Sequence, residues 1–189
     1  MNLFLDLAAL VIAILWLLWF FIPIFSGIPW VPTNRKWMNS ALQLVDLKPG
    51  ETVYDLGCGD GRVLITAGRE YGTRGVGFEI SLLHCLVAQY QVWRAGLGKT
   101  ISIRWKNYYR VDLSQADVIY FYGHTKLADK LKRHLEEHLR DGVRIVSIRV
   151  DLPGWQPEKI DKDNLIFVYR MPPTPGDVAS FMMQEALKD

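Results

Sequence analysis

The chain has 189 residues and a formal net charge of +2, a length that accommodates one domain with short extensions. This near-neutral balance lacks the strong basic excess by which nucleic-acid-binding domains attract phosphate, so we expect no nucleic-acid partner. The two cysteines, Cys58 and Cys85, are too few for a disulfide framework, which is typical of a domain in a reducing, cytosolic compartment.

The amino-terminal segment is almost entirely apolar. From Leu7 to Phe25 it contains no charged residue, and with the residues before Asp6 it provides about 20 apolar residues, enough for a membrane-spanning helix. No lysine or arginine precedes the segment and no A-x-A site follows it, which disfavours a cleaved signal peptide. Arg35 and Lys36 follow it, so the positive-inside rule places the larger domain on the cytoplasmic side. The segment therefore predicts a single-pass contact with the lipid bilayer, with a buried helix as the other alternative.

Downstream of a connector rich in proline and glycine, helical and strand patterns alternate along the chain. This alternation predicts an α/β fold, a Rossmann-like doubly wound and mostly parallel sheet whose two faces are covered by helices. The predicted divisions are a transmembrane anchor over 1–27, a connector over 28–36, a globular domain over 37–171, and a carboxy-terminal tail or last strand over 172–189. The expected strands are Thr52–Leu56, Gly75–Glu79, Ile101–Trp105, Ala116–Tyr122, Val143–Val150 and Leu165–Arg170, with helices over Trp37–Val45, Gly61–Tyr71, Ser81–Ala95 and Thr125–Arg140.

A glycine-rich turn follows the first expected strand, with the pattern D-x-G-x-G-x-G formed by Asp55, Gly57, Gly59 and Gly61. Glycine tolerates positive φ and lets a backbone pass close to a bound nucleoside. Dinucleotide folds use G-x-G-x-x-G beside a pyrophosphate, whereas an acid before the first glycine repels phosphate and suits a cationic amino group. The turn therefore predicts S-adenosylmethionine as cofactor, with Asp55 holding its ammonium group. Asp60 is also assigned to this site, and it can serve at the same time as a helix N-terminal acid favoured by the helix dipole.

Further polar residues stand where the second and third expected strands end, at the edge where such sheets bind ligands. Glu79 can accept hydrogen bonds from both ribose hydroxyls, and the alternative is an ordinary surface acid. Asn107 can bond the adenine edge, and the alternative is a turn-forming asparagine. We place Tyr108 near the adenine.

The chain carries a family resemblance beyond the glycine turn. Val31-Pro32-Thr33 precedes the domain, Val76-Gly77-Phe78-Glu79 ends the second strand, and Arg149 to Pro157 reads R-V-D-L-P-G-W-Q-P after the fifth. With these motifs the chain resembles the class I S-adenosylmethionine-dependent methyltransferases. It is most similar to the membrane-anchored protein lysine methyltransferases that modify the c-ring protein of ATP synthase and the adenine nucleotide translocase, and to their prokaryotic relatives. The resemblance implies methyl transfer to a protein lysine at the membrane surface, with Thr33 joining the cofactor-binding residues.

A lysine acceptor needs an aromatic slot, because desolvation lowers the pKa of its amine and aromatic faces attract its ammonium form. Aromatic residues gather near the expected strand ends, and we assign Tyr122 and Trp155 to the acceptor channel as catalytic residues. The alternative is that some of them pack in the core, since residues of a strand alternate between its faces.

The sequence is also compatible with other functions. A lipid-soluble small molecule could replace lysine as acceptor, and an inactive cofactor-binding scaffold is a third alternative. Nucleic-acid methylation is disfavoured because Phe121 to His124 replace the N-P-P-[YF] exit of amino-methylating DNA enzymes. His134 to His138 matches the H-x-x-E-H zinc-peptidase pattern, but it lies on a charged helix without a third ligand, so we predict no metal site.

Overall fold

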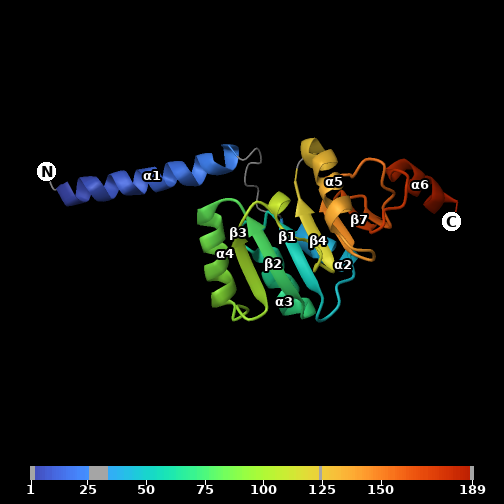
Figure 1. Cartoon of the computed structure of the whole chain (residues 1–189), viewed down its shortest axis with the longest axis horizontal. Coiled ribbons are helices and arrows are strands. Elements are labelled where there is room, and N and C mark those ends of the chain that lie inside the picture. Colours follow the sequence, from blue (N-terminus) through green and yellow to red (C-terminus); the bar gives the residue numbers. More distant parts are fainter. Residues whose placement is uncertain (1–2, 26–33, 124, 188–189) are drawn as a thin grey trace.

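The computed structural model describes residues 3–25, 34–123 and 125–187. Its centre is a seven-stranded sheet in the order β3-β2-β1-β4-β5-β7-β6, with β7 antiparallel to both of its neighbours and the other pairs parallel (Figure 1). This arrangement confirms the predicted Rossmann-like, mostly parallel sheet. The strands are β1 Thr52–Leu56, β2 Arg74–Glu79, β3 Ile101–Trp105, β4 Val118–Tyr122, β5 Arg144–Ile148, β6 Lys159–Asp161 and β7 Ile166–Arg170.

Two apolar cores lie on opposite faces of the sheet, since alternate strand residues face opposite sides. Helices α2 (Arg35–Leu44), α3 (Arg62–Tyr71) and α4 (Leu82–Arg94) form the first core with Val53 and Val118. Helix α5 (Ala128–His138) forms the second core, with Tyr54 and Phe121 among its strand residues. The short helices η1 (Tyr108–Arg110) and η2 (Thr125–Leu127) complete the connections around β4.

The carboxy-terminal part differs from the sequence prediction. Three residues, Lys159–Asp161, form the edge strand β6, which is too short for a periodic pattern to reveal. Residues 172–189, predicted as a tail or last strand, instead contain helix α6 (Val178–Ala186). The side chain of Asp177 accepts a hydrogen bond from the backbone N–H of Ser180 at 2.7 Å and caps this helix. Helix α6 therefore begins at a capping residue visible in the sequence, and the last strand is β7.

Helix α1 (Leu3–Phe25) lies apart from the sheet and the helices packed on it (Figure 1). Over the parts of the chain that the structure describes, none of the helices combines the length and the apolar character needed to cross a membrane. The transmembrane helix predicted over 1–27 therefore has no support in this structure.

Candidate active site

The glycine turn is held between β1 and β2 by backbone hydrogen bonds. The N–H groups of Gly57 and Cys58 both donate to the carbonyl oxygen of Phe78, at 2.9 and 3.0 Å. Gly57 has a φ of +96°, and a Cβ at this position would meet no atom of the described part of the chain within 4 Å. The left-handed backbone conformation is therefore what requires glycine here, and the space beside the turn is open to a ligand. Gly59 and Gly61 also have positive φ, so this geometry fits the close approach predicted for a bound cofactor.

The Asp55 carboxyl group is buried close to two other acidic side chains. Asp55 is 3% exposed, and its Oδ2 atom is buried with no hydrogen-bond partner in residues 3–25, 34–123 and 125–187. Burial, followed by the negative charges of Glu79 and Asp60, raises the pKa of Asp55 well above its usual range. A buried carboxylate without a partner is costly, and such cost is tolerated where a ligand supplies the missing charge. The site therefore fits the ammonium group of S-adenosylmethionine, as predicted from the sequence.

Glu79 is buried, with 8% of its surface exposed, so the alternative of an ordinary surface acid does not fit. Its Oε2 accepts a hydrogen bond from Gly59 N at 3.0 Å, and its Oε1 accepts one from Ser81 N at 2.8 Å. Each carboxylate oxygen has a second lone pair that can accept a ribose hydroxyl. Glu79 thus fixes the glycine turn and the start of α4 while keeping acceptors for a cofactor.

Replacing Glu79 by alanine is expected to weaken cofactor binding and to destabilise the fold together. Two buried backbone N–H groups lose their acceptor, at a cost of roughly 1–3 kcal/mol for each unsatisfied group. Calorimetric titration with S-adenosylhomocysteine and thermal unfolding measure the two losses. The E79Q variant is the matched control, because its amide oxygen keeps one acceptor. An unchanged melting temperature in E79A would contradict the proposed support of the turn.

The Asp60 side chain bonds its neighbour Arg62, and its predicted contact with the cofactor stays a prediction. Arg62 donates to both of its carboxylate oxygens, with Nη2 at 2.6 Å from Oδ2 and Nε at 2.9 Å from Oδ1. Burial tends to raise the pKa of Asp60, but the hydrogen bonds and charge of Arg62 outweigh it and lower the value. Asp60 also accepts from the backbone N–H of Arg62 at 3.3 Å. The role of a helix N-terminal acid therefore describes this contact.

The adenine-side predictions fall at the end of β3. The Oδ1 atom of Asn107 accepts a hydrogen bond from Tyr109 N at 3.0 Å, which caps η1 and matches the turn-forming alternative. Tyr108 packs edge-on against Phe121 with ring centroids 6.4 Å apart, and it is partly buried against the α5 core. The adenine contacts of Asn107 and Tyr108 stay predictions, and Thr33 lies outside the described residues.

Tyr122 lies beside the glycine turn. Leu56 at the end of β1 pairs with Phe121 of the parallel strand β4. The next residues along the two strands are Gly57 and Tyr122, so the backbone of Tyr122 lies next to the start of the turn. The Tyr122 ring is half-buried on the α2 side of the sheet, 6.5 Å from the ring of Trp37. This position beside the open turn fits the assigned role in the acceptor channel.

Sequence reasoning did not single out two neighbours of Tyr122. Trp37 comes from α2, and the guanidinium carbon of Arg149 lies 5.3 Å from the centre of its ring. Arg149 follows β5 with a φ of +62°, a conformation that L-residues adopt at a cost and that often occurs at functional sites. Arg149 is the first residue of a motif that carries the family resemblance, and this motif was the sequence feature that could have identified it. For Trp37 the sequence offered no such feature, apart from its place on a predicted amphipathic helix.

Trp155 does not reach this site, which corrects the sequence prediction. It is 2% exposed in the core beneath α5, on the opposite face of the sheet from Tyr122. Its ring packs edge-on against Tyr169 at 5.8 Å, and its Nε1 donates to Glu136 Oε1 at 3.1 Å. Trp155 is therefore a core residue that holds the segment after β5, which was the alternative for these aromatic residues.

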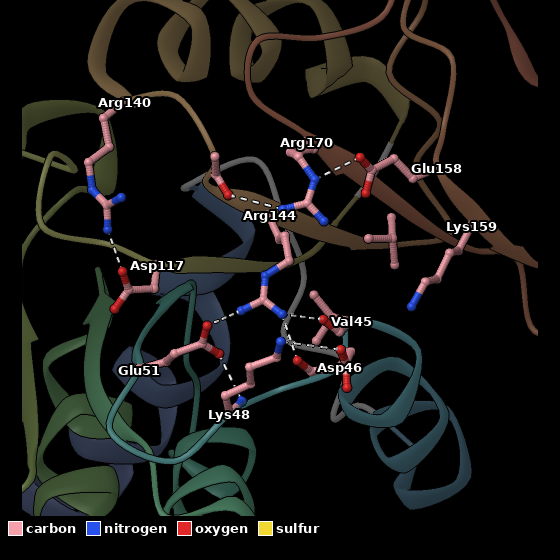
Figure 2. A pocket seen from close by; sticks show the side chains of 12 residues that line it. Val45, Asp46, Lys48, Glu51, Asp117, Arg140, Arg144, Glu158, Lys159 and Arg170 are labelled. Carbon is pink, nitrogen blue, oxygen red and sulfur yellow. Dashed lines mark hydrogen bonds and ion pairs between the residues drawn. The ribbon is translucent and has the colours of Figure 1, made fainter.

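A cavity of about 320 Å³ lies at the other edge of the sheet, where β4 and β5 begin (Figure 2). Arg144 enters it from β5 and donates to the carbonyl oxygens of Val45 and Asp46 at 2.8 and 2.6 Å. Its arginines pair with carboxylates, as Arg140 with Asp117, Arg144 with Glu51 and Arg170 with Glu158. These groups satisfy one another and lie away from the glycine turn, so we assign the cavity a structural role.

The H-x-x-E-H pattern on α5 is used within the fold. His134 Nε2 lies 3.0 Å from the carbonyl oxygen of Tyr108, and His138 Nδ1 lies 2.9 Å from the carbonyl oxygen of His134. In the described ranges no three His, Cys, Asp or Glu residues are arranged to hold a metal ion.

Comparison with known proteins agrees with this geometry. Residues 55–159 match the ANTKMT methyltransferase domain. A protein-lysine N-methyltransferase from Saccharolobus islandicus is 35% identical over 136 residues, which cover 71% of this chain and 84% of that protein. The mouse adenine nucleotide translocase lysine N-methyltransferase is 30% identical over 137 residues, which cover 72% of this chain and 59% of that protein.

A solved structure provides the cofactor context. An RNA methyltransferase from Salinibacter ruber in complex with S-adenosyl-L-homocysteine is 32% identical, with a TM-score of 0.73. The match covers 78% of this chain and 99% of that chain. Open parallel sheets bind ligands beyond the carboxyl ends of their strands, and Asp55 and Glu79 lie at these ends of β1 and β2.

Proposed function

This chain belongs to the ANTKMT methyltransferase family, and on that premise we propose that it transfers a methyl group from S-adenosylmethionine to a lysine of a protein substrate. The observation that carries the proposal is the buried, unpartnered carboxylate oxygen of Asp55 beside the open glycine turn. The named activity of the Saccharolobus islandicus relative supports lysine as the acceptor.

The chain's own residues would act mainly by positioning. When bound, S-adenosylmethionine supplies an already activated methyl group, so the reaction needs an amine held in line at about 3 Å. Asp55 and Glu79 orient the cofactor, and Gly57 leaves room beside it. The Arg149 guanidinium already lies over the Trp37 ring, so the neighbouring Tyr122 ring would supply the aromatic face that attracts a lysine ammonium and, by excluding water, favours its neutral, nucleophilic form.

The acceptor is proposed to be membrane-associated, with the catalytic domain on the cytoplasmic side. The mouse relative named for the adenine nucleotide translocase supports such a substrate. Helix α1 supports attachment of this chain, because its sequence carries Asp6 as the single charged residue and its side chains from Leu10 to Leu17 are largely exposed and apolar. The full-length protein should remain in the membrane pellet after a carbonate wash, and its complete release would exclude insertion of α1.

The proposed acceptor is tested by incubating the full-length protein with methyl-labelled S-adenosylmethionine and membranes from its own source. Label on lysine of a membrane-associated protein, identified by mass spectrometry, is the expected result. The D55N variant is the matched control, since it should transfer none. Label found only in the organic extract would replace lysine with a lipid-soluble small molecule, and absence of any transfer would favour a cofactor-binding scaffold.

RNA is the second candidate acceptor, and one observation favours it. The Salinibacter ruber protein is named an RNA methyltransferase and is 32% identical to this chain. The net charge of +2 argues against RNA, because nucleic-acid binding requires cations that neutralise phosphates. Including total RNA in the same incubation decides between them, since label in the RNA fraction would displace the lysine proposal.

A further inference from the structure

Helix α4 packs on the sheet with one side, yet apolar residues occupy its outward side as well. Cys85, Ala88 and Val92 are buried against the sheet, at the spacing of one helical face. The outward side should therefore be polar, as on other surface helices of soluble domains. Instead, large apolar residues occupy it.

We call the large exposed apolar residues on and beside α4 the α4 apolar face: Ile80, Leu82, Leu86, Tyr90, Trp93 and Trp105. Trp93 is 72% exposed and Trp105 is 59% exposed. Tyr90 and Trp93 lie with ring centroids 6.0 Å apart, and Trp105 Nε1 donates to the carbonyl oxygen of Ile80 at 2.8 Å. Helix α4 and strand β3 form one end of the domain, and no other described helix covers the outer side of α4 (Figure 1).

The charges around this face have one sign. Residues 80–110 contain no aspartate or glutamate, and all their lysines and arginines are exposed: Arg94, Lys99, Arg104, Lys106 and Arg110. The whole chain, by contrast, is almost balanced at +2. Tryptophan and tyrosine favour the boundary between lipid tails and headgroups, and adjacent lysines and arginines attract anionic headgroups.

We propose that the α4 apolar face is a membrane-docking surface for a bilayer that contains anionic lipids. Lipid fits better than a second copy of the chain, because two such faces would bring like charges together. Ile80 directly follows Glu79, so docking would set the cofactor-binding edge next to the membrane surface. This inference concerns how the domain sits on lipid and holds whichever acceptor is methylated.

The test uses the full-length protein with a single added cysteine, because both native cysteines are buried. In L86C, an environment-sensitive fluorophore should shift to the blue and be quenched by brominated lipid when vesicles contain phosphatidylserine. The matched control is K162C, whose exposed position lies in the β6–β7 turn at the far end of the sheet. There the label should show neither change. In vesicles of phosphatidylcholine alone, the quenching at position 86 should be largely lost.

Three results would overturn the proposal. Equal quenching at positions 86 and 162 would mean that the domain has no preferred orientation on lipid. A blue shift at 86 that grows with protein concentration without vesicles would assign the face to a second copy of the chain. A shift that appears only when membrane proteins are added to the vesicles would assign it to a protein partner. Methyl transfer can be measured on the same labelled protein. A protein that fails to dock on lipid is therefore distinguishable from one that lacks the proposed activity.

Discussion

Replacing Asp55 by asparagine is expected to reduce the affinity for S-adenosylmethionine by about 30-fold to several thousand-fold, and to abolish measurable transfer at ordinary cofactor concentrations. This range corresponds to the roughly 2–5 kcal/mol lost when one member of a buried charge pair is removed. Asp55 qualifies because its carboxylate is buried and one of its oxygens has no hydrogen-bond partner among the residues that the structure describes. Calorimetric titration measures the change, and an affinity within about threefold of the wild type would remove Asp55 from the ammonium site.

The same carboxyl group predicts a pH dependence of cofactor binding. Burial, with the charges of Glu79 and Asp60, raises its pKa in the free protein, whereas a bound ammonium group favours the charged form and lowers it. Cofactor binding therefore releases a proton between these two values, and affinity should increase as the pH rises through that range. Titrations in buffers of different ionisation enthalpy measure the proton release, which D55N should lack.

Asp55 should affect the stability of the cofactor-free protein in the opposite direction. Because its pKa is higher in the folded than in the unfolded state, its contribution is fully present below the unfolded value, near 3.9, and is lost as the pH rises through the folded value. The asparagine variant lacks this loss. It should therefore melt at the same or a higher temperature than the wild type at alkaline pH, which separates lost binding from lost folding.

The parts of the site that could be predicted from the sequence are those set by local backbone chemistry. The turn from Asp55 to Gly61 is one such part, because positive φ at alternating positions requires glycine whatever packs around it. Glu79 was found from its place at the end of the second expected strand, at the distance from the glycine turn where α/β nucleotide-binding folds carry an acid. Its second task, accepting the N–H of Gly59, depends on a contact across 20 residues that spacing alone does not reveal.

The predictions that failed depend on which face of the sheet a residue occupies. Tyr122 and Trp155 are both aromatic and both follow strands, yet one lies on the α2 side and the other under α5. A residue in an irregular segment after a strand has no fixed alternation, so sequence cannot assign its face. Trp37 was missed for the converse reason, because it reaches the site from a helix that carries no motif. The predicted cofactor residues therefore depend on local pattern, whereas the predicted acceptor residues depend on tertiary placement.

Replacing Tyr122 by alanine is expected to lower kcat by about 30- to 100-fold while leaving cofactor affinity nearly unchanged. A cation–π contact in a desolvated site contributes about 2 kcal/mol, which is about 30-fold in rate, and misplacing the amine by about 1 Å costs about 100-fold, so either loss alone gives a drop in this range. Tyr122 meets these conditions because it directly follows Phe121, which pairs with Leu56 just before the glycine turn, and its ring packs next to that of Trp37. Steady-state kinetics on the identified acceptor and calorimetric titration of S-adenosylhomocysteine measure the two quantities separately.

The Y122F variant decides which part of the side chain acts. If the aromatic face holds the lysine, phenylalanine should retain most of the turnover, whereas a loss equal to that of Y122A would assign the effect to the hydroxyl group. The Y90A variant on the exposed side of α4 controls for general loss of a surface aromatic and should leave kcat unchanged with soluble acceptor peptide. Equal losses of kcat and cofactor affinity in Y122A would exclude Tyr122 from the acceptor site, because a wall that contacts only the incoming amine cannot change how tightly the cofactor binds.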